Sequence, residues 1–110
     1  MTALYPESIQ KLTEALLTAK GASKTELRQA VEARVAVHSG ATREAGTIPA
    51  DLVVYVDKVA LHAYKVVDED IEKLRTAGYS EDKIFEVTLS AALGAGLARL
   101  ERSLSLLKGE

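Results

Sequence analysis

The chain has 110 residues, of which 47% are hydrophobic and 27% charged, a balance typical of one soluble globular domain. Its net charge is −2 with the two signs interspersed, so no basic stripe favours nucleic-acid binding. The absence of cysteine excludes disulfides, thiolate nucleophiles and cysteine metal sites. We therefore expect a single domain over residues 1–110, without thiol peroxidase activity.

The N-terminal segment, MTALYPES, lacks the basic region and apolar core of a signal peptide, so a cytoplasmic location is expected. The longest uncharged run near the C-terminus, Val87 to Ala98, has 12 residues, fewer than the ~20 needed to cross a bilayer. No membrane association is predicted.

A first helix is predicted over residues 6–19. Pro6 suits the first helical position, where its missing N–H is no loss. Isoleucine and leucine recur behind it at helical spacing and form a single apolar stripe. Gly21 is the expected C-terminal cap.

A second helix is predicted over residues 23–38. Ser23 and Glu26 have the spacing of a capping box, in which each side chain bonds a free backbone N–H of the other. Gly40 marks the end of the helix. His38 lies near that C-terminal end, where a protonated imidazole interacts favourably with the helix dipole. The glycine- and threonine-containing residues 39–48 then indicate a surface loop.

A third helix is predicted over residues 49–66, beginning at Pro49. Its valines favour a strand by composition, but its apolar residues recur every three or four positions, which indicates a helix. A break is expected at residues 66–68.

A fourth helix is predicted over residues 68–77, with Asp68 as its cap and Gly78 as its stop. Its acidic first turn is explained by the helix dipole, because basic residues follow towards the other end. It lacks the spacing and glycine of a calcium loop. Neither histidine has a partner histidine or cysteine at ligand spacing, so no metal site is predicted.

The last helix, predicted over residues 80–107, organises the fold. Ser80 is a good N-cap, and two acidic residues follow it. Two apolar faces run along the helix, one of them through Phe85 and a series of leucines. A helix that is apolar on two sides is normally buried between neighbours, so we expect this alanine- and glycine-rich helix to be buried.

Small residues gather in the middle of this helix, among them Ala91, Gly94, Ala95 and Gly96. Each glycine costs on the order of 1 kcal/mol relative to alanine in a helix interior. Close approach of another helix would offset that cost, and the partner helix belongs either to this chain or to a second subunit.

The segment LRTAGYSEDKIFEVTLSAALGAGLARL, residues 74–100, resembles the C-terminal half of carboxymuconolactone decarboxylase proteins, a family that includes the alkylhydroperoxidase D-like group. The shared pattern is an alanine–glycine helix end, a serine with acidic residues, and a helix rich in small residues. The resemblance covers roughly residues 49–107. It implies an all-α, alkylhydroperoxidase D-like bundle of about five helices that assembles into trimers or hexamers.

The reactive residues of that family are missing here. Peroxidase-type members carry C-x-x-C and a histidine upstream of the glycine that matches Gly78. Counted back from Gly78, the histidine position falls on Asp70 and the cysteine positions fall on Val66 and Ala63. A family glutamate falls near Asp51, where a carboxylate survives.

Two functions follow as hypotheses. The first is a catalytically silent, homo-oligomeric binding or interaction protein, with a small-molecule ligand as one possible partner and no cofactor. The second is a thiol-independent acid–base enzyme, of decarboxylase or isomerase type, acting on a small organic acid or lactone. Its candidate residues are Asp51, His62, Tyr64 and Asp70, in a cleft near the break after the third helix. It requires at least two of them to converge on one partly apolar pocket.

Overall fold

The structure is a computed structural model that describes residues 6–41 and 44–109. Over these ranges the chain forms five α-helices and one 3₁₀ turn, and no strand. In chain order these are α1 (Glu7–Thr18), α2 (Thr25–His38), α3 (Ala50–His62), η1 (the 3₁₀ turn Ala63–Lys65), α4 (Asp68–Thr76) and α5 (Glu81–Leu107). The predicted all-α class is confirmed, whereas the alkylhydroperoxidase D-like arrangement stays a prediction. Residues 1–5 of the N-terminal segment and residues 42–43 of the predicted loop lie outside the described residues.

Several helix ends follow from local signals in the sequence. The Ser80 hydroxyl accepts a hydrogen bond from the backbone N–H of Lys83 at 3.2 Å, as expected of an N-cap. Gly40 and Gly78 follow α2 and α4 with φ of 99° and 102°, a left-handed conformation that glycine adopts without steric cost. Both therefore act as the predicted stops.

The predicted signals between α1 and α2 are wrong. Helix α2 begins at Thr25 with Lys24 as its N-cap and no side-chain cap, so Ser23 and Glu26 form no capping box. The Ser23 hydroxyl instead donates to Glu86 of α5. Gly21 is not in the left-handed region and does not cap α1, which ends at Thr18. A long-range contact has replaced the local one in this connector.

The third helix is shorter than predicted. It ends at His62, whose φ of −145° and ψ of 52° leave the helical region, and η1 follows it. Val67, not Asp68, is then the N-cap of α4, and its backbone N–H donates to the Asp70 carboxylate at 2.8 Å. The expected break therefore begins four residues early and spans the whole connection from α3 to α4.

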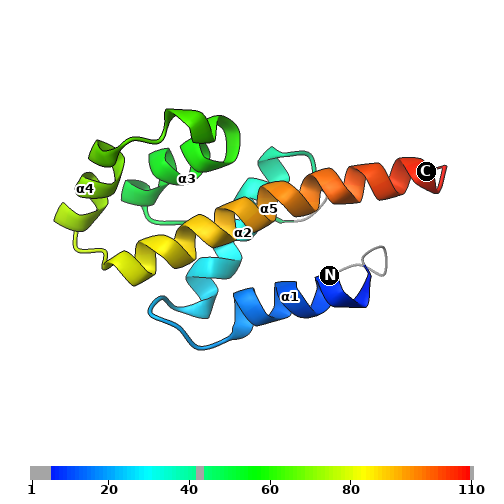
Figure 1. Cartoon of the computed structure of the whole chain (residues 1–110), viewed down its shortest axis with the longest axis horizontal. Helices are drawn as coiled ribbons and strands as arrows, with labels where there is room; N and C mark the ends of the chain where they lie inside the picture. The colour runs from blue at the N-terminus through cyan, green and yellow to red at the C-terminus, as the bar shows by residue number, and fades with distance from the viewer. Residues whose placement is uncertain (1–5, 42–43, 110) are drawn as a thin grey trace.

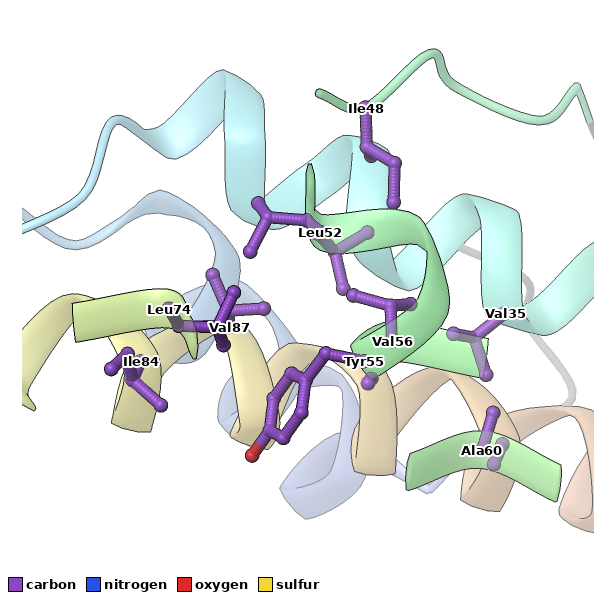
Figure 2. Close-up of a cluster of buried hydrophobic side chains, with 12 residues drawn as sticks. Val35, Ile48, Leu52, Tyr55, Val56, Ala60, Leu74, Ile84 and Val87 are labelled. Carbon is purple, nitrogen blue, oxygen red and sulfur yellow. The ribbon is translucent and has the colours of Figure 1, made fainter. Parts of the chain in front are cut away.

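Helix α5 lies at the centre of the fold, with α3 and α4 on one side and α1 on the other, and α2 crosses against it (Figure 1). The core forms where α2, α3 and α5 meet. Its fully buried side chains include Val31, Leu52, Val56 and Val87. Figure 2 shows Leu52 and Val56 projecting from α3 into this cluster, with Leu74 of α4 and Val87 of α5 closing one end of it.

Only one of the two apolar faces of α5 is buried along its length, and the other is covered in part. The face with Ile84, Val87, Ala91, Ala95 and Ala98 packs into the core. On the other predicted face, Phe85, Leu89 and Leu107 are exposed, while Leu97 is buried. Leu93, Leu100 and Leu104 on this face are half-buried. The expectation that α5 is buried on both sides is therefore wrong where Phe85, Leu89 and Leu107 are exposed.

The two mid-helix glycines of α5 have different surroundings. A Cβ built on Gly94 would lie 2.5 Å from the carbonyl oxygen of Glu32 and 3.1 Å from the Cβ of Val35, so glycine permits α2 to approach closely. A Cβ built on Gly96 would meet nothing within 4 Å. Ala91 and Ala95, on the same side as Gly94, are buried. Within this chain, the close approach is made at Gly94 and not at Gly96.

Candidate functional site

A pocket of about 290 Å³ opens between α3 and α4. It is lined by Ala50, Asp51, Val54, Tyr55, Asp70, Lys73 and Leu74. Tyr55 and Leu74 are buried and form an apolar floor, whereas Ala50, Asp51, Val54 and Lys73 are exposed at the rim. A concave, largely apolar surface with a few polar groups is the usual form of a small-ligand site.

Asp70 is the most firmly held polar group in the pocket. Its carboxylate accepts from the backbone N–H of Val67 at 2.8 Å and from the Lys58 ammonium at 2.9 and 3.1 Å. The Val67 bond and then the Lys58 bond lower the pKa of Asp70, because both favour its ionised form. Asp70 is therefore a fixed anionic acceptor at neutral pH.

Asp51 lies at the start of α3, and its carboxylate is held by a residue outside the α3–α4 pair. The Tyr79 hydroxyl donates to Asp51 Oδ1 at 2.7 Å. Burial, and then this bond to a carboxylate, raise the pKa of Tyr79 to about 12, so the phenol stays protonated at neutral pH. This contact ties the residue before the N-cap of α5 to the first turn of α3, and it orients the Asp51 carboxylate at the rim of the pocket.

The structure brings together two of the four predicted site residues. Asp51 and Asp70 line the same pocket, although they are 19 positions apart in the chain. His62 and Tyr64 do not line it. His62 is the last residue of α3 and Tyr64 lies in η1, and both rings are at the surface. There they pack edge to face with centroids 6.1 Å apart, and Tyr64 is 81% exposed.

Three residues that shape the pocket were not selected by the sequence analysis. Lys58 pairs with Asp70, Lys73 lines the rim, and Tyr79 holds Asp51. The two partnerships join residues 12 and 28 positions apart, a separation at which helical periodicity gives no signal.

A second polar cluster fastens the α1–α2 connector to α5. The Glu86 carboxylate accepts from the backbone N–H groups of Ala22 and Ser23, both at 2.8 Å, and from the Ser23 hydroxyl. Burial acts to raise the pKa of Glu86, but these bonds and the charge of Arg28 outweigh it and leave the pKa lowered. The carboxylate is therefore ionised and fully engaged in holding the connector.

Arg28 extends this cluster to α1. Its guanidinium is buried and donates to the carbonyl oxygens of Leu16, at 2.6 Å, and Ala19. It thereby places a cation at the negative end of α1, where the carbonyls lack helical partners. The cluster has a structural explanation, so we do not assign it a ligand.

Among the described residues, no group of three or more histidine, aspartate or glutamate side chains is arranged to hold a metal ion. In the same part of the chain, no helix is both long and apolar enough to span a membrane. Comparison with protein-family models, curated proteins and solved structures finds no match for the chain. The resemblance to carboxymuconolactone decarboxylase proteins accordingly stays a prediction.

Proposed function

We propose that the protein is a non-catalytic binding protein that takes a small organic acid in the pocket between α3 and α4. The observation that carries this proposal is the arrangement of Asp51 and Asp70, two carboxylates fixed by donors of the same chain above an apolar floor. Fixed acceptors over an apolar surface orient a bound ligand.

The ligand class follows from the charges at the rim. Lys73 lines the pocket as a cation, whereas the charge of Asp70 is compensated by Lys58. A ligand carboxylate is best placed near Lys73, with the apolar body on Tyr55 and Leu74. Asp51 then favours a hydroxyl or amine on the ligand that donates to it. A small hydroxy acid or amino acid satisfies all three requirements.

Acid–base catalysis on a small organic acid or lactone is the alternative. It is supported by the shared position of Asp51 and Asp70 at one pocket. A general base at neutral pH needs a raised pKa, and the pKa of Asp70 is lowered. Asp51 would have to act as the base, with Lys73 binding the substrate carboxylate.

The experiment is a thermal-shift screen of small hydroxy, amino and unsubstituted acids and lactones, followed by calorimetric titration of any compound that raises the melting temperature. A ligand that binds only the folded state raises stability by mass action. Lys73→Ala and Asp51→Asn are expected to weaken binding about tenfold each, as loss of one charge-assisted contact does. His62→Ala, outside the pocket, is the matched control.

Loss of binding in His62→Ala, or unchanged binding in both pocket variants, would contradict the assignment of this pocket. Turnover of the bound compound that disappears in Asp51→Asn would favour the enzyme instead. Self-association into a trimer or hexamer, which the family resemblance implies, is part of the proposal but does not depend on the pocket.

A further inference from the structure

The outward face of α5 carries a largely apolar strip of exposed residues that ends in one cation. We define the outer strip as Phe85, Leu89, Ala92, Gly96 and Arg99, all of which are exposed. These residues recur alternately every four and three positions, the spacing of the seam between two packed helices. Phe85 is 62% exposed, which is unusual for the only phenylalanine of the chain.

Gly96 in the outer strip has no packing explanation within one copy. Glycine in a helix interior is destabilising relative to alanine, and at Gly96 a Cβ would meet nothing within 4 Å. Gly94, two residues away, is required by the approach of α2, but Gly96 is not. A small residue at Gly96 is explained if another surface packs onto it.

We propose that the outer strip is a homodimer interface, in which α5 of a second copy packs antiparallel with the two-fold axis between Leu89 and Ala92. In this register Phe85 of each protomer faces Gly96 of its partner, and Leu89 faces Ala92. A two-fold axis requires the strip to be complementary to itself. Here each large side chain meets a small one, which lets the helices approach closely.

The charges along α5 agree with the same register. Glu81 and Asp82 are exposed in its first turn, and Arg99 is exposed at the other end of the strip. Antiparallel packing places each Arg99 beside the partner's acidic first turn, at both ends of the dimer. Parallel packing would place Arg99 against Arg99. Arg75 of the same chain already bonds Glu81, at 2.5 Å, so Asp82 is the acid most available to Arg99 of the other copy.

This inference rests on the self-association included in the proposed function and names its surface. Of the two assemblies named there, a two-fold interface is compatible with the hexamer and not with the trimer. The inference does not depend on the ligand pocket. The outer-strip proposal and the pocket proposal can each be contradicted without the other. Oligomeric state tests the outer strip, and ligand binding by Gly96→Leu, a variant that keeps the pocket intact, tests the pocket.

The first experiment uses the absence of native cysteine. Ala92→Cys should cross-link to a dimer under mild oxidation, because the two copies of residue 92 lie close to the axis, within reach of a disulfide. Ser103→Cys, exposed on the same helix, is the matched control. Its two copies lie ~37 Å apart along the antiparallel pair and should stay reduced. Cross-linking of Ser103→Cys as fast as Ala92→Cys would overturn the antiparallel register.

The second experiment is analytical ultracentrifugation of the full chain. The wild type should sediment as a dimer or a multiple of one. Gly96→Leu and Arg99→Glu should each raise the dimer dissociation constant about tenfold or more. Gly96→Leu fills the space that Phe85 of the partner subunit occupies, and Arg99→Glu places like charges together. Arg102→Glu, exposed on α5 but outside the strip, should not. Circular dichroism confirms that each variant is folded. A monomeric wild type at high concentration, or equal effects of Arg99→Glu and Arg102→Glu, would overturn the interface.

Discussion

Gly94 of α5 lies against α2 so closely that a Cβ at this position would stand 2.5 Å from the carbonyl oxygen of Glu32. The obstacle is a helix backbone, which cannot move aside as a flexible side chain can. The contact lies between the two helices that share the most extensive packing in the fold, so a side chain at residue 94 would push them apart.

Gly94→Ala should therefore destabilise the protein by about 1–3 kcal/mol, because the clash outweighs the better helix propensity of alanine. Gly96→Ala is the matched control, since its Cβ would meet nothing within 4 Å. It should stabilise the monomer by up to about 1 kcal/mol. Urea unfolding of both variants at low protein concentration measures the difference. A stabilised Gly94→Ala would show that α2 is not held at this distance.

Removing the Glu86 carboxylate should loosen the α1–α2 connector. Glu86→Ala leaves the backbone N–H groups of Ala22 and Ser23 and the Ser23 hydroxyl without their acceptor. Because Ser23 is buried, we expect a loss of about 2–3 kcal/mol. Hydrogen exchange should show the largest loss of protection at residues 19–25. Glu14→Ala, at an exposed position on α1, is the control and should change stability little.

The Asp70 contacts should make stability sensitive to acid. The pKa of Asp70 is lowered below its ordinary 3.8 in the folded state, so its contribution is present above that value and is lost as the pH falls through the folded pKa. Asp70→Asn should be less stable than the wild type at pH 7. The two stabilities should converge as the pH falls below about 4, as urea unfolding over this range would show. A constant difference would mean that Asp70 acts through its shape and not its charge.

The Tyr79 contact should make the stability of the fold sensitive to alkaline pH. The pKa of Tyr79 is raised from 10.0 to about 12, so its stabilising contribution is complete below pH 10 and is lost as the pH rises through about 12. Absorbance of tyrosinate, compared between the wild type and Tyr79→Phe, isolates this late titration. Asp51→Asn should move it to lower pH, because it removes the carboxylate that favours the protonated phenol. An unchanged titration in Asp51→Asn would leave burial as its sole cause.

The sequence by itself determined the all-α class, the five helices and several of their ends. Ser80, Gly40 and Gly78 act through hydrogen bonds and backbone conformation within a few residues, so their effect is readable locally. The failed prediction between α1 and α2 has a long-range cause. Ser23 has the spacing of a capping box, but a carboxylate 63 positions away binds its hydroxyl instead, and no short pattern contains that residue.

The tertiary structure decided which surfaces are used. Both apolar faces of α5 have helical spacing, and only the position of α2 and α3 determines that the Val87 face is buried and the Phe85 face exposed. The sequence likewise suggested four site residues near one break. The early end of α3 at His62 removed two of them from the pocket, while the Lys58 and Tyr79 contacts fixed Asp70 and Asp51 at it. Periodicity indicates that a face can be covered, but only packing determines what covers it.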